Sequence, residues 1–260
     1  MAQALMPAAS PLMGTLLPMR LKLISCEVLF REMCHACAHS PHRVDLEFLP
    51  KGLHDLGGKS MAAKIQEAVD RTAEGEYQAI LLGYGLCGNG LDGLTARHTR
   101  LVLPRAHDCI ALLMGSHDRY QAYFDGNPGT YYRSTGWLER GQGLQQLTHR
   151  TMGFDESLEA LVRQYGEDNG RYLYEEMMRY QSQYRKITFI ETGLEAGGRF
   201  VDEAADEARE KGWTFERLQG DLAWLGRLLA GEWTDAEFVV AEPGRHFAAS
   251  YDDAVVKVQA

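Results

Sequence analysis

The chain has 260 residues, of which 45% are hydrophobic and 24% charged, and this composition is typical of a folded globular protein with a sizeable core. Its formal net charge of -9 argues against nucleic-acid binding, so small molecules or other proteins are the expected partners. No apolar run reaches the roughly 18 residues of a membrane span, and residues 1–18 lack the basic start and apolar core of an export signal. We therefore expect a cytoplasmic protein with a disordered leader at 1–18, no membrane association and five reduced cysteines.

The first part of the chain predicts strands that alternate with helices. Short, apolar, β-rich runs predict four strands, at residues 21–26, 43–49, 77–85 and 99–105. Between the second and third runs, residues 58–74 have the apolar spacing of a helix. One face of this helix would carry Met61, Ile65, Ala68 and Val69. Alternation of this kind favours a parallel sheet.

Residues 157–185 predict a helical stretch that breaks between Gly166 and Gly170. The alternation then returns, with strands expected at 186–193, 214–220 and 237–244 and helices at 199–212 and 221–231. The sequence thus predicts an α/β protein whose parallel sheet is flanked by helices. A helical segment at 151–185 would separate two strand-helix blocks, at 19–150 and 186–260, which form either one sheet or two lobes.

Cysteines and a histidine follow the predicted strands at their carboxyl ends. Cys26 ends the first strand, His54 follows the second, Cys87 the third and Cys109 the fourth. In open parallel sheets the loops beyond these ends line one crevice, where ligands bind. We therefore expect Cys26, Cys87 and Cys109 to share a site. The alternative is that each is a small buried hydrophobe.

Three kinds of chemistry suit such a site. Three thiolates would hold a [4Fe-4S] cluster with one iron open to substrate. Zinc is the second possibility, either closed by His54 or His107 as fourth ligand or left open to a substrate atom. The third uses no metal: Cys87 would be a nucleophile, with His107 as its base.

The stretch "GYGLCGNG" (83–90) surrounds Cys87 with glycines. Glycine allows a close approach to the main chain, so Gly83, Gly85, Gly88 and Asn89 are predicted to bind the cofactor through the backbone. Ordinary turn chemistry is the alternative.

Polar residues near the cysteines predict catalytic roles. We expect His107, Asp108 or His54 to move protons, and Arg105 to clamp a carboxylate or phosphate of the substrate. Arg105 could instead pair with Asp108. Glu27 and Arg31 have the i, i+4 spacing of a helical ion pair, which would occupy both side chains.

Two further patterns have structural as well as functional interpretations. Cys34 and Cys37 have the C-x-x-C spacing of half a zinc site, but no second C-x-x-C follows and residues 30–40 predict one helix, which favours a structural role. Residues 127–137, "NPGTYYRSTGW", predict a turn followed by aromatic and hydroxyl side chains. These side chains would either close over the crevice as a lid or pack against the core.

Five stretches, in this order, carry a resemblance to a known family: "ISCEVLFRE", "DLEFLPKGLHDLG", "AILLGYGLCGNGL", "LVLPRAHDCIALLMGS" and "NPGTYYRSTGWLERG". They resemble an uncharacterised domain-of-unknown-function family of bacteria and archaea, whose genes often lie near corrinoid-dependent methyltransferases of methylated-amine metabolism. The resemblance spans residues 21–245 and implies a shared fold, but it supplies no reaction. It implies a shared site at Cys26, His54, Cys87, Arg105, His107, Asp108 and Cys109.

Together these features lead us to expect a metal-dependent enzyme that acts on a small molecule of one-carbon, methylated-amine or sulfur metabolism. The alternative is an accessory protein that handles a metal or corrinoid for a methyltransferase, with a corrinoid protein or methyltransferase as its partner. An enzyme needs an enclosed crevice, whereas a carrier needs exposed ligands and a docking surface.

Overall fold

The computed structural model describes residues 17–56, 58–140, 158–181, 183–250, 252 and 254–260. Of the leader predicted at 1–18, all but residues 17 and 18 lies outside these ranges, as does the junction at 141–157. Within the described ranges, no helix is both long enough and apolar enough to cross a membrane.

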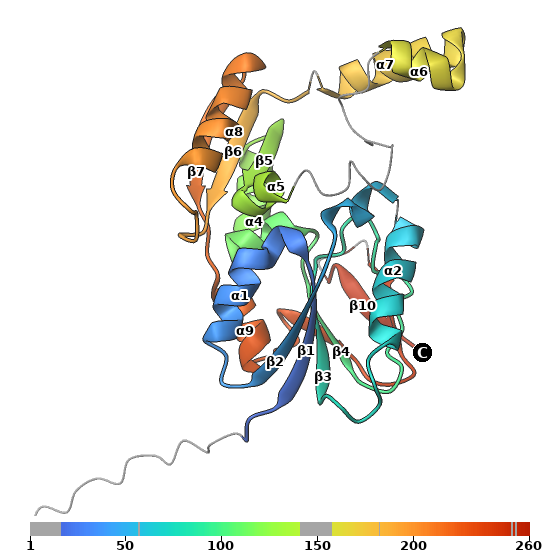
Figure 1. Ribbon diagram of the computed structural model, residues 1–260, viewed down its shortest axis with the longest axis vertical. Helices are drawn as coiled ribbons and strands as arrows, with labels where there is room; N and C mark the ends of the chain where they lie inside the picture. Colours follow the sequence, from blue (N-terminus) through green and yellow to red (C-terminus); the bar gives the residue numbers. More distant parts are fainter. Residues whose placement is uncertain (1–16, 57, 141–157, 182, 251, 253) are drawn as a thin grey trace, which may run out of the picture.

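A five-stranded sheet forms the centre of the molecule, with the strand order β2-β1-β3-β4-β8 (Figure 1). Its strands are β1 (Arg20–Cys26), β2 (Arg43–Leu49), β3 (Ala79–Gly83), β4 (Leu101–Pro104) and β8 (Phe238–Ala241). The first four are parallel, as predicted, and β8 joins the edge antiparallel to β4. The α/β class and the mostly parallel sheet are therefore confirmed.

Helices cover both faces of this sheet, which explains why β3 and β4 are continuous apolar runs without an exposed face. On one face lie α1 (Phe30–Ala38) and α9 (Ala223–Ala230), and on the other lies α2 (Gly58–Asp70) (Figure 1). The predicted apolar face of α2 is the buried one, formed by Met61, Ile65, Ala68 and Val69.

A second, smaller parallel sheet has the order β5-β6-β7. It consists of β5 (Thr130–Ser134), β6 (Lys186–Glu191) and β7 (Thr214–Gln219), and α8 (Arg199–Glu210) packs on it. Residues 127–137 were expected to form a turn followed by side chains that either close over the crevice or pack against the core. Residues 130–134 form the edge strand β5, which α5 (Thr135–Glu139) follows, and Tyr131, Tyr132 and Trp137 pack against the hydrophobic cores. The run Thr-Tyr-Tyr suits a strand, because β-branched and aromatic side chains pack well on a pleated surface.

Sheet membership does not follow the order of the chain. β5 precedes the helical segment and yet pairs with β6, whereas β8, near the end of the chain, returns to the large sheet. The helical segment contains α6 (Leu158–Tyr165) and α7 (Glu167–Gln181), which pack against each other. The predicted break lies at Gly166, whose φ of 84° is left-handed. The predicted domain boundaries stay predictions.

The carboxyl ends of the two parallel sheets meet. A Cβ at Gly136, just after β5, would overlap the carbonyl oxygen of Val28, just after β1. Just after β6, Thr192 Oγ1 donates to Glu32 Oε1 at 3.0 Å. The connecting elements are η1 (Glu27–Leu29), η2 (Lys51–Leu56), α3 (Cys109–Met114) and α4 (His117–Gly126). Near the end of the chain, β9 (His246–Ala249) and β10 (Val256–Gln259) pair antiparallel in a two-stranded sheet.

Candidate functional site

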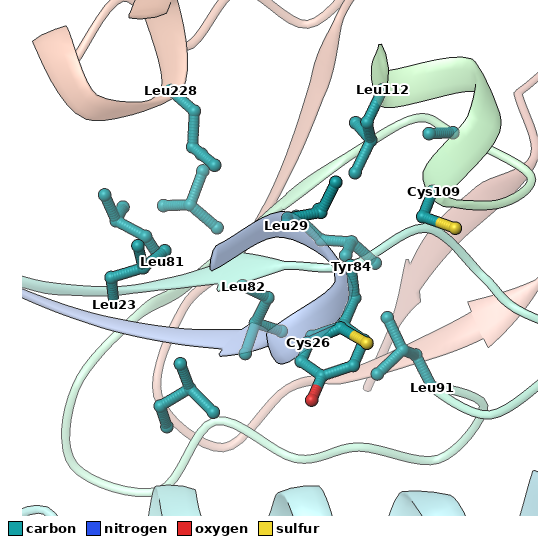
Figure 2. Packing of buried hydrophobic residues seen from close by; sticks show 14 of the residues in the cluster. Leu23, Cys26, Leu29, Leu81, Leu82, Tyr84, Leu91, Cys109, Leu112 and Leu228 are labelled. Carbon is teal, nitrogen blue, oxygen red and sulfur yellow. The ribbon is translucent and has the colours of Figure 1, made fainter. Parts of the chain in front are cut away.

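The structure brings Cys26, Cys87 and Cys109 to the carboxyl ends of three adjacent strands, β1, β3 and β4. Cys26 and Cys109, 2% and 4% exposed, belong to the main core (Figure 2). Cys87 is half-buried. The three thiols are close enough for their charges to interact: burial raises the pKa of Cys109, and the charges of Cys87 and Cys26 raise it further.

None of the three thiols ionises readily in the metal-free protein. Burial raises the pKa of Cys26 to about 12. The pKa of Cys87 also lies well above its ordinary range because of burial, with an added contribution from the charge of Asp108. A thiol is a weak nucleophile, whereas the thiolate is the reactive species. The raised pKa values therefore favour the protonated thiol at all three positions.

His54 belongs to the same site. It follows β2 in η2, and its Nε2 lies 3.7 Å from the sulfur of Cys26. Burial, followed by the charge of Lys51, lowers the pKa of His54, which favours the neutral imidazole. A neutral imidazole can accept a proton or ligate a metal.

The chain turns left-handed at Cys87. Cys87, Gly88 and Asn89 have φ values of 49°, 64° and 65°, and only glycine adopts this conformation without a steric cost. The backbone N–H of Cys87 holds the turn by donating to the carbonyl of His107 at 2.8 Å. Strained backbone of this kind persists where the surrounding structure enforces it, and it concentrates at ligand sites.

The predicted cofactor-binding glycines divide into two groups. A Cβ at Gly83 would overlap the side chain of Ser25, and one at Gly85 would lie 2.6 Å from the backbone of Asp108. These two glycines are therefore explained by close packing within the protein. At Gly88, by contrast, a Cβ would meet no atom within 4 Å. Of the three, Gly88 is the one that leaves the backbone accessible.

Asp108 and Arg105 do not form the salt bridge that the sequence allowed. Asp108 Oδ1 accepts from the backbone N–H groups of Ile110 and Ala111 at 2.9 and 3.0 Å and so caps α3. Its Oδ2 accepts from the hydroxyl of Tyr120 at 3.0 Å. The carboxylate thus accepts three hydrogen bonds and holds the start of the helix that begins with Cys109.

The guanidinium of Arg105 donates to three backbone carbonyls, those of Asp235, Ala254 and Val256, at 2.6–3.0 Å. These contacts hold the C-terminal strand against the large sheet. They use the Nε and Nη1 donors of the guanidinium and give Arg105 a structural role, whereas its role as an anion anchor stays a prediction.

His107 is exposed and lies on the outer side of the left-handed turn. Its ring centroid is 5.5 Å from that of His117, and both rings line a pocket of about 600 Å³ together with Leu86, Gly88 and Asn89. His107 therefore faces this pocket, while its carbonyl supports the backbone of Cys87.

Two other sequence interpretations concern α1. Cys34 and Cys37 are half-buried on this helix, and the thiol of Cys37 donates weakly to the carbonyl of Val44 at 3.9 Å, which fits a structural role. Arg31 pairs with Glu139 at 2.8 Å, across to the small sheet, and not with Glu27. Glu27 Oε1 instead accepts from the backbone N–H of Lys51 at 2.8 Å.

Tyr84 was not predicted to belong to the site, and Trp137 was predicted only to pack against the core or to form part of a lid. Tyr84 is 1% exposed, and its hydroxyl has no hydrogen-bond partner among the described residues. The buried indole N–H of Trp137 also lacks a partner within normal geometry, yet it lies near enough to Cys109 to lower the pKa of that thiol in part. A tyrosine inside the glycine stretch was the available signal for Tyr84.

Comparison with known proteins identifies the family. The model of the family described as "Protein of unknown function (DUF1638)" matches residues 48–229, which include His54, Cys87 and Cys109. Neither a search of the curated proteins nor a search of the solved structures found a match. Because the family model covers more than half of its length, this chain belongs to the DUF1638 family.

Proposed function

We propose that this protein is a metal-dependent enzyme that binds a [4Fe-4S] cluster through Cys26, Cys87 and Cys109 and acts on a small molecule. The observation that carries the proposal is the convergence of three thiols from adjacent strand ends, two of them buried and Cys87 half-buried, each within electrostatic range of the others. Zinc is the second choice of metal. The resemblance described above points to one-carbon, methylated-amine or sulfur metabolism as the source of the substrate.

The residue types at the site fit a cluster. Cysteine thiolates are the standard ligands of iron–sulfur clusters, and three of them would leave one iron of a [4Fe-4S] cluster without a protein ligand. The N–H of Trp137, which favours the thiolate form of Cys109, would also suit a metal-bound sulfur.

Burial favours an enzyme over a metal or corrinoid carrier. A carrier that passes its cargo to a methyltransferase needs exposed ligands, but Cys26 and Cys109 are 2% and 4% exposed. The raised pKa values of all three thiols also weigh against a metal-free cysteine nucleophile.

A cluster with one iron lacking a protein ligand supplies a Lewis acid, and the chain's own residues would do the rest. His54, neutral and adjacent to Cys26, is the residue best placed to accept or return a proton. Asp108 acts by orienting α3 through its capping bonds, and Tyr120 holds that carboxylate in place. The buried position of the thiols excludes water from the reacting groups.

The test is metal analysis of anaerobically purified protein. We expect about four iron and four sulfide per chain in the wild type, and a loss of most of this iron in the Cys87→Ser and Cys109→Ser variants. Cys34→Ser is the matched control, because Cys34 is a half-buried cysteine on α1 that is predicted to be structural, and its metal content should stay at the wild-type level. Stoichiometric zinc without sulfide would favour the second choice. Wild-type protein free of iron and zinc would refute the proposal.

A further inference from the structure

Buried polar groups without a hydrogen-bond partner are concentrated in one short segment of the described chain. Among the described residues, eight buried side-chain nitrogen or oxygen atoms have no hydrogen-bond partner. Five of them belong to Tyr84, Tyr132, Ser134, Thr135 and Trp137. Four of these five come from one short segment, residues 132–137, which spans the end of β5 and the start of α5.

This segment faces the thiol site. Residues on a strand alternate between its two faces, so Tyr132 and Ser134 share a face that Tyr131 does not. Tyr132 and Trp137 pack against the main core that contains Cys26 and Cys109, whereas Tyr131 packs against the small core of the second sheet. The ring of Trp137 also lies 6.1 Å from that of His54.

The chemistry of the segment is that of hydrogen-bond donors. The three hydroxyl groups of Tyr132, Ser134 and Thr135 can all donate, and the indole N–H of Trp137, which can only donate, lies next to the sulfur of Cys109. The nearby carboxylate of Asp108 accepts from two N–H groups and the hydroxyl of Tyr120, and none of the four groups donates to it. Lys51 brings a positive charge to this place: its Nζ lies 4.7 Å from the centroid of the Trp137 ring and donates to the Trp137 carbonyl at 3.3 Å.

We propose that residues 132–137 bind an oxyanion, a carboxylate or a phosphate group of the substrate, beside the three thiols. This inference rests on the proposed function, because it places the anionic group of the substrate next to the metal centre. The proposal gives residues 132–137 the anion-binding role that the sequence analysis predicted for Arg105. Several neutral donors and one nearby ammonium group can hold an oxyanion without a direct arginine pair.

The proposal predicts that substitutions in this segment keep or raise the stability of the ligand-free protein and at the same time weaken its binding of an oxyanion. A buried hydroxyl without a partner destabilises the folded protein, so replacing it by an apolar group of the same shape should be neutral or stabilising. Thr135→Val and Tyr132→Phe should therefore keep or raise the melting temperature of the ligand-free protein, by up to about 2–4 °C. The same changes should weaken binding of an oxyanion about tenfold each, because each removes a bond to a charged group.

The experiment titrates the full-length protein, purified anaerobically with its metal, with sodium acetate and, in a separate series, with inorganic phosphate. Binding is followed through tryptophan fluorescence, since Trp137 lies in the segment, and iron content is measured on the same samples. Tyr131→Phe is the matched control, because it removes a hydroxyl from the neighbouring residue on the opposite face of β5. Its affinity should equal that of the wild type.

Saturable binding of acetate alone would identify the group as a carboxylate, and binding of phosphate alone would identify it as a phosphate. The proposal is overturned if neither probe binds to wild-type protein that contains its metal, or if Thr135→Val and Tyr132→Phe bind the probes as well as Tyr131→Phe does. If the wild-type protein proves to contain no metal and still binds a probe, and if Thr135→Val and Tyr132→Phe bind that probe less tightly, the proposed function is refuted. The oxyanion site is then still supported.

Discussion

The two parallel sheets bring different chemistry to the place where their carboxyl ends meet. The large sheet contributes the thiols Cys26, Cys87 and Cys109, whose pKa values are all raised. The end of the small sheet at β5 and the helix α5 that follows contribute hydroxyl groups that have no hydrogen-bond partner among the described residues. The thiols and these hydroxyl groups thus come from separate parts of the fold.

The two sheets also differ in how much core supports them. The large sheet rests on an extensive buried cluster, whereas the fully buried cluster of the small sheet consists of Ile187, Phe189, Ala204 and Ala208. A region with little buried apolar surface opens at a lower free energy than the rest of the molecule. The small sheet is therefore expected to open at a lower free energy than the large sheet.

The largest expected effects come from truncating each core. Leu23→Ala, at a position that is 0% exposed in the large sheet, should lower the free energy of unfolding by about 2–5 kcal/mol, and Phe189→Ala in the small sheet by about 3–5 kcal/mol. We expect Phe189→Ala to bind acetate or phosphate poorly and to keep its iron, whereas Leu23→Ala should lose both. Chemical unfolding and iron analysis measure these effects. Loss of iron from folded Phe189→Ala would show that the sheets do not act separately.

A second test concerns the contact between the sheets. Gly136→Ala places a methyl group against the carbonyl of Val28, so α5 would have to move away from η1, at a cost of about 1–3 kcal/mol. Gly226→Ala is the control, because a Cβ at this position in α9 meets no atom within 4 Å. Alanine there should stabilise the helix by about 0.5–1 kcal/mol. Equal melting temperatures for the two variants would mean that the contact is not tight in solution.

A third test compares the residues that precede α3 and α5. Asp108 accepts from two backbone N–H groups, whereas the side chain of Ser134 makes no capping bond. Asp108→Ala should therefore cost about 0.5–2 kcal/mol, and Ser134→Ala should be neutral or slightly stabilising. Thermal unfolding of the two variants measures the difference. A larger loss for Ser134→Ala would contradict the assignment of its hydroxyl as unpartnered.

The smallest effect depends on pH and arises at the same junction. Glu32 is 2% exposed, and burial raises its pKa, although the hydroxyl of Thr192 donates to it. Because the pKa is higher in the folded than in the unfolded state, the stabilising contribution of this group is complete below the unfolded value of about 4.3 and declines as the pH rises through the folded value. Glu32→Gln cannot ionise and should lose less stability over this range.

Melting temperatures of the wild type and Glu32→Gln, measured from pH 4 to pH 8, test this expectation. The difference should grow in favour of Glu32→Gln as the pH rises. A difference that stays constant over the whole range would show that Glu32 does not titrate abnormally.

Much of the fold could be predicted from the sequence, because local patterns determine local structure. The four first strands, the buried face of α2 and the break at Gly166 follow from apolar periodicity and from the conformational freedom of glycine. The convergence of three cysteines could be anticipated for a related reason. Parallel strands end at the same edge of a sheet, so residues distant in sequence become neighbours there.

Only the tertiary structure decided which sheet each strand joins and what each polar side chain contacts. The strand period is the same in both sheets, so nothing local to residues 130–134 specifies that β5 pairs with β6, or that β8 returns to β4. The partners of Arg105 lie 130 to 151 residues away in the sequence, and the unpaired state of Ser134 and Thr135 depends on everything that surrounds them. These properties come from long-range packing, in which the position of each donor is set by segments that share no pattern with it.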